Sequence, residues 1–143
     1  AGIMTMGADG VWCASVFLPT TEAETSENIK EKMIQATSSQ TVRSKSRTGK
    51  HSRQLQSAWT DAWESKDAPE PLPMPLQTIV GEPALAIVSK QATLGNEGAK
   101  KLDTYWVGQG IGLVNETISA GQTVQKFKEE FVGAYERITN LVD

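Results

Sequence analysis

Residues 7–17 read Gly-Ala-Asp-Gly-Val-Trp-Cys-Ala-Ser-Val-Phe, and this stretch decides the predicted fold. The turn Gly7–Gly10 leads into the apolar run Val11–Phe17, which is typical of a strand buried on both faces in a parallel sheet. The run contains two small residues, Ala14 and Ser15, shortly before a predicted helix. Small residues between a strand and a helix let bare backbone N–H groups approach an anion, usually a phosphate. On spacing alone an ordinary strand-to-helix turn is the commoner interpretation, so both stay open.

Length and composition indicate one soluble globular domain. The chain has 143 residues, of which 38% are hydrophobic and 22% charged, and this is enough for a real core. A net charge of −3 gives no general attraction to nucleic acid or to an anionic membrane. No apolar run approaches the roughly 18 residues of a membrane span, and no signal peptide is visible. Because a single cysteine, Cys13, fits a reducing compartment, we expect a cytoplasmic protein.

Helical patterns cover much of the middle of the chain. The first predicted helix, residues 21–36, begins at a Thr-x-x-Glu capping box. The second, residues 52–64, carries apolar residues every three or four positions, including Trp59 and Trp63. Such a tryptophan pair normally belongs to a core and less often forms a substrate wall. The third helix is predicted over residues 76–91.

Proline and glycine mark the breaks between these helices. Residues 65–75 hold four of the six prolines and are predicted to cross the molecule without forming a helix. Pro83 falls inside the third helical pattern, so a kink or a break is expected at Gly81–Glu82. Residues 93–99, with two glycines and an asparagine, are predicted to form a mobile loop.

The strongest helical periodicity lies at the carboxyl end. Ser119 and Gln122 form a capping box for this last helix. Its apolar residues are spaced alternately by three and four: Val124, Phe127, Phe131, Ala134, Ile138 and Leu141. This face either packs on its own domain or forms a seam with a partner helix, and the pattern alone leaves both possible.

The most basic part of the chain is residues 40–53. Side chains alternate over residues 40–48, which predicts an extended segment with Arg43, Lys45 and Arg47 on one side. No aromatic residue is interleaved to stack on bases, so a solvated strand face is favoured over nucleic-acid binding.

Candidates for direct chemistry are few. The single histidine, His51, fits no catalytic pattern and is interpreted as an exposed structural residue rather than a general base. Cys13 has no placed histidine partner and is assigned to the core. One histidine and one cysteine do not make a closed metal site without several carboxylates. We therefore predict no catalytic residue and no metal ligand in this chain.

Four segments resemble the C-terminal part of the nitronate monooxygenase family, also called 2-nitropropane dioxygenase-like. These are FMN-dependent TIM barrels related to flavin-dependent enoyl reductases. The matching segments are Gly7–Phe17, Thr48–Glu64, Pro71–Gln77 and Gly108–Leu113. The first resembles the family's last barrel strand, which reads Gly-Ala-Asp-Gly-Val, then two variable residues, then Gly-Thr or Gly-Ser and an aromatic residue. This chain carries Ala14 where the family usually has Gly.

The resemblance implies an α/β fold: the C-terminal segment of a (β/α)8 barrel, with its last strand and helix, plus a mostly helical small domain. Taken as an isolated piece, this chain would be mainly α-helical. Residues 1–39 would hold the last barrel strand and its helix, residues 40–117 a lid domain, and residues 118–143 the C-terminal helix. A complete barrel takes at least about 200 residues. We therefore expect this chain to be the C-terminal portion of a longer enzyme.

The resemblance also implies FMN as the cofactor. Trp12, Cys13, Ala14 and Ser15 match the residues that hold the phosphate end of FMN, through backbone amides and the Ser15 hydroxyl. Gln109, in a Gly-Gln-rich motif, either reaches the flavin or substrate pocket or belongs to close glycine packing. The implied reaction is oxidation of nitronates or nitroalkanes with O2, and the implied partner is a small-molecule substrate. A flavin-dependent enoyl reductase is an alternative.

A different class of function also fits the pattern. The chain would then be a non-enzymatic helical module descended from such an enzyme. It would dimerise through the Phe127–Leu141 stripe together with Trp59 and Trp63. The expected partners are therefore a second copy of the chain, giving a homo-oligomer, or the missing N-terminal portion of the barrel.

Overall fold

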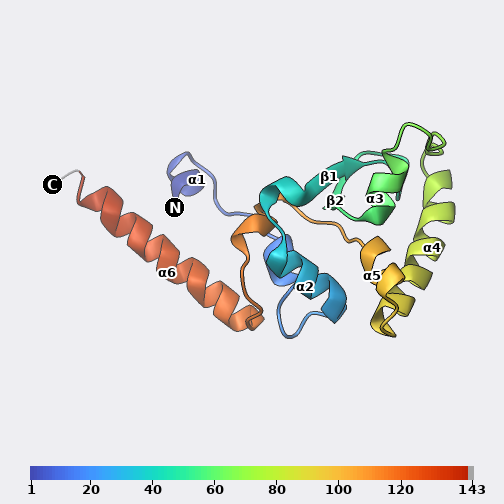
Figure 1. Ribbon diagram of the computed structural model, residues 1–143. Helices are drawn as coiled ribbons and strands as arrows, with labels where there is room; N and C mark the ends of the chain where they lie inside the picture. The colour runs from blue at the N-terminus through green and yellow to red at the C-terminus, as the bar shows by residue number, and fades with distance from the viewer. Residues whose placement is uncertain (142–143) are drawn as a thin grey trace.

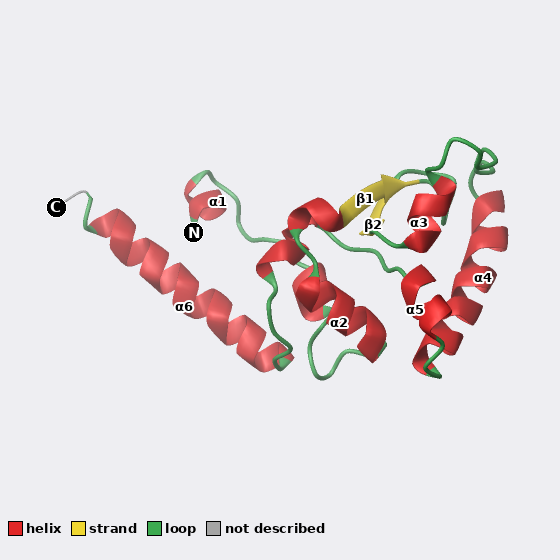
Figure 2. Cartoon of the chain, in the orientation of Figure 1, coloured by secondary structure: helices red, strands yellow, loops and turns green. Residues whose placement is uncertain are grey.

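The computed structural model describes residues 1–141 and shows a mostly helical, elongated chain around a small antiparallel hairpin (Figure 1). Helix α4 lies at one end of the molecule and helix α6 at the other. Figure 2 shows how little of the chain is strand. The helices and strands are α1 (Gly2–Thr5), α2 (Glu27–Gln35), β1 (Thr41–Ser44), β2 (Ser52–Leu55), α3 (Ala58–Trp63), α4 (Leu76–Thr93), α5 (Glu97–Leu102) and α6 (Ala120–Thr139). Three 3₁₀ turns join them: η1 (Ser15–Phe17), η2 (Ser38–Gln40) and η3 (Gln109–Leu113).

The hydrophobic core lies where α2 meets β2 and η3. The hairpin pairs Thr41 with Leu55 and Ser44 with Ser52, which turns the Leu55 side chain toward α2. The buried core residues are Ile29, Met33, Leu55, Val107 and Ile111. Contacts between residues this distant in sequence fix the middle of the molecule, because burial of apolar side chains dominates folding free energy.

The predicted buried strand at residues 11–17 is wrong. Residues 11–14 are irregular and exposed, and residues 15–17 form η1. Cys13 is exposed rather than part of the core. A strand buried on both faces needs hydrogen-bonded neighbours, and within residues 1–141 no strand lies beside this segment.

Two of the predicted helices are shorter than expected. The helix predicted at residues 21–36 begins only at Glu27, because Ser26 rather than Thr21 accepts the capping hydrogen bond, from the Ile29 N–H at 3.4 Å. The helix predicted over residues 52–64 is confined to α3, since residues 52–55 pair with β1 as strand β2. Tertiary pairing overrides the helical spacing there.

The proline-rich and glycine-rich regions agree in part with the predictions. Residues 65–75 cross without a helix, as predicted. Helix α4 continues through Pro83, so the predicted break does not occur. Near this point α4 packs closely on the loop between β1 and β2. A Cβ on Gly81 would lie 3.1 Å from the Ser46 carbonyl oxygen in that loop. The loop predicted at residues 93–99 is shortened by α5.

The predicted C-terminal helix is confirmed. Ser119 and Gln122 form the capping box, with the Ser119 side chain accepting from the Gln122 N–H at 3.1 Å. Helix α6 extends away from the body of the molecule (Figure 1). Its amino-terminal half contacts η1, where the rings of Phe17 and Phe127 lie 6.5 Å apart. None of the helices formed by residues 1–141 has the length and apolar content needed to cross a membrane.

Candidate functional site

A pocket of about 750 Å³ lies between residues 12–15 and the amino-terminal half of α6. Trp12, Cys13, Ala14 and Ser15, the residues predicted to contact a phosphate, all line it. The opposite wall comes from η3, the following segment and α6, chiefly Gly108, Gly110, Leu113, Glu116, Thr123 and Phe127. The volume falls within the range of small-molecule and cofactor sites.

The backbone of the first wall carries unused hydrogen-bond donors. The N–H groups of Trp12, Cys13 and Ala14 make no hydrogen bond to any of residues 1–141. All three residues are exposed and line the pocket. Free backbone N–H groups bind an anion where they converge on it.

Ser15 joins the two walls. Its Oγ accepts a hydrogen bond from the Gly108 N–H at 2.7 Å. A Cβ at position 108 would lie 3.3 Å from the same oxygen, so glycine permits this close approach. Because the oxygen acts as acceptor, the Ser15 hydroxyl hydrogen remains available to donate to a ligand.

Gln109 lies at the edge of the pocket rather than in its wall. Its neighbours Gly108 and Gly110 line the pocket, but Gln109 does not and is exposed in η3. Of the predicted site residues, Trp12, Cys13, Ala14 and Ser15 line the pocket, whereas Gln109 does not.

The charged residues of the pocket were missed from the sequence. Lys126 forms an ion pair with Glu116, and Glu130 lies one helical turn further along α6. With one cation and two carboxylates, the side chains make the pocket slightly acidic, so attraction for an anion has to come from the backbone at residues 12–15. The only available sequence signal was the position of Lys126 in the turn after the Ser119 capping box.

The position of α6, and hence of one pocket wall, is set by two hydrogen bonds at its amino end. The Glu22 carboxylate accepts from the Ala120 N–H at 2.9 Å, and the Thr21 N–H donates to the Ile118 carbonyl at 3.1 Å. The Ala120 N–H, with help from the Thr21 hydroxyl, holds the pKa of Glu22 below its ordinary value. An acidic group at a helix amino terminus also complements the helix dipole.

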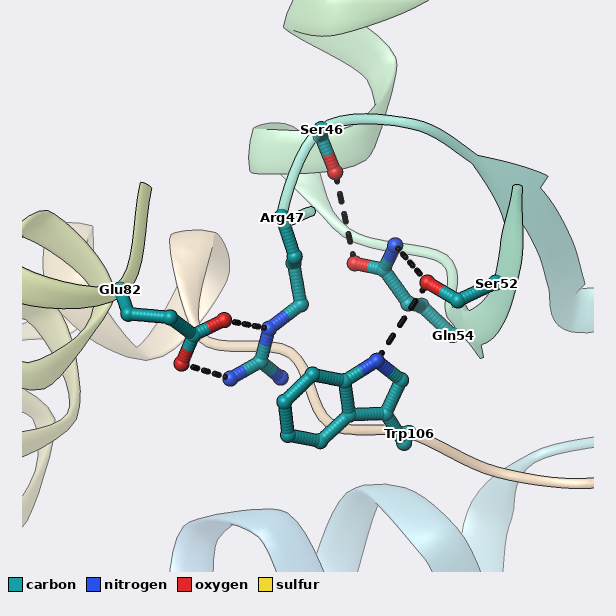
Figure 3. Close-up of polar contacts among 6 residues, drawn as sticks. All are labelled: Ser46, Arg47, Ser52, Gln54, Glu82 and Trp106. Atoms are coloured by element: carbon teal, nitrogen blue, oxygen red, sulfur yellow. Dashed lines mark hydrogen bonds and ion pairs between the residues drawn. The ribbon is translucent and has the colours of Figure 1, made fainter. Parts of the chain in front are cut away.

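The prediction of a solvated basic face is wrong for Arg47. It is 5% exposed and lies in the loop between β1 and β2. Its Nε and one terminal nitrogen each donate to Glu82 of α4 at 2.7 Å, and its guanidinium carbon lies 3.6 Å from the Trp106 ring centroid (Figure 3). Alternation of side chains in the sequence gave no sign that α4 would cover this side of the loop.

Polar side chains also fill the space beside Arg47. Gln54 is fully buried; its amide nitrogen donates to the Ser52 hydroxyl at 3.3 Å, and its oxygen accepts from the Ser46 hydroxyl at 3.4 Å (Figure 3). The Trp106 indole N–H donates to the same Ser52 hydroxyl at 3.3 Å. This network lies outside the pocket lining and joins the hairpin to Trp106, which also forms an isolated antiparallel bridge with Gln54.

Asp103 and Lys32 form a second polar contact outside the pocket. The Lys32 ammonium donates to the Asp103 backbone carbonyl at 2.6 Å, and the Asp103 carboxylate accepts from the Asn28 amide at 2.9 Å. Burial raises the pKa of Asp103 and lowers that of Lys32. These residues tie α2 to the end of α5, so we assign them a structural role.

His51 is exposed, as the sequence predicted. Among residues 1–141 no group of three His, Cys, Asp or Glu side chains is placed to hold a metal ion.

Comparisons with known proteins point to one family. The family model described as "Nitronate monooxygenase" matches residues 1–130. The chain is 48% identical over 145 residues to "Putative monooxygenase Rv1533" of Mycobacterium tuberculosis, covering 99% of this chain and 38% of that protein. It is 28% identical over 127 residues to "Probable nitronate monooxygenase" of Bacillus subtilis, covering 89% of this chain and 35% of that protein.

The solved structure of FabK from Thermotoga maritima has a similar fold. It superposes with a TM-score of 0.69 at 23% sequence identity, covering 96% of this chain and 41% of FabK. The chain thus spans less than half the length of each of these proteins. Because the family model matches most of the chain, this protein belongs to the nitronate monooxygenase family.

Proposed function

We propose that the protein carrying this chain is an FMN-dependent oxidoreductase that oxidises nitronates or nitroalkanes with O2. In this proposal, residues 12–15 hold the phosphate end of FMN, and residues 40–117 form the lid over the flavin. The observation that carries it is the pocket wall in which the N–H groups of Trp12, Cys13 and Ala14 are unused beside the Ser15 hydroxyl.

The donors on this wall fit a phosphate group. The free backbone N–H groups supply up to three donors, and the Ser15 hydroxyl supplies a fourth because its oxygen is already held by Gly108. Hydrogen bonds from neutral donors to a charged oxygen are stronger than neutral pairs, which makes such a cradle effective even beside Glu116 and Glu130. The pocket volume of about 750 Å³ accommodates part of a nucleotide.

When bound, FMN would supply the electron chemistry of the reaction, and the protein would supply binding, orientation and exclusion of water. This chain's part is to fix the phosphate and so set the register of the flavin against the substrate. The Ser15–Gly108 hydrogen bond connects that phosphate site to η3, so movement of η3 and movement of the phosphate wall would be coupled.

We further propose that residues 11–14 complete a (β/α)8 barrel as its last strand. Their backbone is irregular, exposed and unpaired here, and a barrel strand is stabilised by hydrogen-bonded neighbours. The greater length of the relatives supports this reading, because they contain more than twice as many residues as the matched segment. Barrel strands would cover the exposed side of residues 11–14.

The test is to purify the full-length protein and record its absorption spectrum. We expect flavin bands, FMN as the chromophore released by heat, and oxygen consumption with an alkyl nitronate. Flavin with hydride transfer to an enoyl thioester and no nitronate oxidation would select the enoyl reductase. A colourless protein that binds no added FMN would overturn the proposal and favour a non-enzymatic module.

A further inference from the structure

Lys126 of α6 is the one cation among the residues of 1–141 that line the pocket. Its ammonium is paired with the Glu116 carboxylate, which comes from the segment between η3 and α6. Glu130 lies four residues further along α6 and also lines the pocket, and side chains at this spacing are neighbours on a helix surface. The ionised side chains of the pocket wall are therefore two carboxylates and a single ammonium group.

The packing of α6 on η1 brings Lys126 to the wall proposed for the phosphate. Phe127 follows Lys126 directly, and its ring centroid lies 6.5 Å from that of Phe17. Phe17 ends η1, and Ser15 begins it. Lys126 is thus attached to α6 where this helix packs on η1, and its side chain lines the same pocket as residues 12–14 with their free N–H groups.

The charge of a phosphate makes this cation important. A phosphate monoester carries a charge of about −1.5 to −2 at neutral pH. The backbone N–H groups that attract it are neutral dipoles, whereas Glu116 and Glu130 repel it. The Lys126 ammonium offsets this repulsion. It has three N–H donors, so it can keep its bond to Glu116 and still donate to a phosphate oxygen. Riboflavin, the same flavin without its phosphate, gains nothing from this cation.

We propose that Lys126 is a specificity-determining residue of the FMN site: it favours the phosphorylated flavin over riboflavin, and Glu116 holds its side chain at the pocket. This inference rests on the proposed function, because it concerns the same phosphate site. The backbone of residues 12–15 supplies the attraction for the phosphate. Lys126 prevents the two carboxylates of the pocket from cancelling that attraction.

The test measures the Kd for FMN and the Kd for riboflavin with the flavin-free full-length protein, by quenching of flavin fluorescence. Lys126→Gln should raise the Kd for FMN about tenfold, because a hydrogen bond to a charged group is lost at a half-exposed site. The Kd for riboflavin should not change. Lys128→Gln removes the same charge from an exposed position of α6 outside this pocket, so both constants should stay at their wild-type values.

Glu116→Gln tests the same idea in the opposite direction. It removes one carboxylate and leaves the Lys126 ammonium at the pocket without its ion-pair partner. The Kd for FMN should therefore fall, and the Kd for riboflavin should again stay the same. Loss of the link between the two residues is common to Glu116→Gln and Lys126→Gln. Opposite effects on FMN therefore separate the charge of Lys126 from a purely structural role.

The possible failures of this proposal are distinguishable from one another. Equal Kd values for FMN in Lys126→Gln and Lys128→Gln would overturn it and leave the proposed function standing, because FMN still binds. An equal rise of both flavin constants in Lys126→Gln would overturn it as well, since Lys126 would then only hold the pocket wall. A wild type that binds both flavins equally well would show no phosphate specificity to explain. A wild type that binds neither flavin would overturn the proposed function too.

Discussion

The Ser15 hydroxyl and the Gly108 N–H, 93 residues apart in sequence, form a 2.7 Å hydrogen bond that joins the two walls of the pocket. The contact gives Ser15 two roles: its oxygen holds η3, and its hydrogen stays free to donate to the proposed phosphate. Residues 12–14 add backbone donors, and Ser15 adds a hydroxyl whose oxygen is held by Gly108, so replacement of Ser15 tests the proposed FMN site directly.

Replacement of Ser15 should therefore weaken FMN binding. Ser15→Ala removes one hydrogen bond to a charged group, which corresponds to a 10- to 100-fold rise in Kd as an order-of-magnitude estimate. Quenching of FMN fluorescence on titration with protein measures this. Ser15→Thr keeps the hydroxyl and serves as the control. Equal affinities for Ser15→Ala and wild type would place the phosphate elsewhere.

Ala14→Gly should strengthen FMN binding. The methyl group of Ala14 stands on the pocket wall between residues that offer bare N–H groups, and it takes up space beside any bound phosphate. Its removal should lower the Kd for FMN a few-fold, whereas Ala14→Val should raise it, because the added bulk blocks the same space. An unchanged flavin affinity in Ala14→Gly would count against this position for the phosphate.

Arg47 should contribute to stability rather than to binding. Arg47→Met removes both hydrogen bonds to Glu82 and the stacking on Trp106, and it leaves the half-buried carboxylate unpaired. We expect a loss of about 2–3 kcal/mol in the free energy of unfolding, measured in urea. Combining Arg47→Met with Glu82→Gln should recover part of this loss. Arg43→Met, at an exposed position, should change stability by less than about 0.5 kcal/mol.

Asp103 makes stability depend on pH. Burial raises its pKa in the folded state, so the ionised carboxyl is disfavoured by folding. The associated stability is fully present below the unfolded pKa and is lost as pH rises through the raised folded pKa. Asp103→Asn, which still accepts from Asn28, should therefore be more stable than wild type at neutral pH, and the difference should disappear in acid. Asp67→Asn, at an exposed site, is the control. A variant less stable than wild type at pH 7 would contradict this account.

Gly49 and Gly95 offer a matched pair of glycine-to-alanine changes. Both have positive φ, +80° and +90°, but a Cβ on Gly49 would overlap the Leu72 carbonyl oxygen, whereas a Cβ on Gly95 would meet nothing within 4 Å. Gly95→Ala should cost about 1–2 kcal/mol from backbone conformation alone. Gly49→Ala should cost about 3 kcal/mol or more, because the proline-rich segment must also move. A similar fall in melting temperature for the two variants would contradict this, because it would mean that the proline-rich segment moves aside at little cost in free energy.

The sequence by itself determined the family resemblance and those elements whose signals are local. The capping box at Ser119 and Gln122 predicted α6, and the prolines of residues 65–75 predicted a segment without helix. These features succeed because capping and proline act on neighbouring backbone groups. The residues proposed to hold a phosphate were also found from the sequence, since small residues in a known motif need no tertiary partner to be recognised.

Only the tertiary structure decided the state of the segments whose partners are distant. Val11–Phe17 has the composition of a buried strand, yet no strand within residues 1–141 lies beside it, so residues 11–14 stay exposed and residues 15–17 form η1. Residues 52–55 have helical spacing, yet pairing with β1 makes them a strand. Arg47 belongs to an alternating basic run, yet Glu82 and Trp106 bury it. In each case the outcome depends on whether another part of the chain pairs with the segment or covers it, and the residues of the segment alone do not encode this.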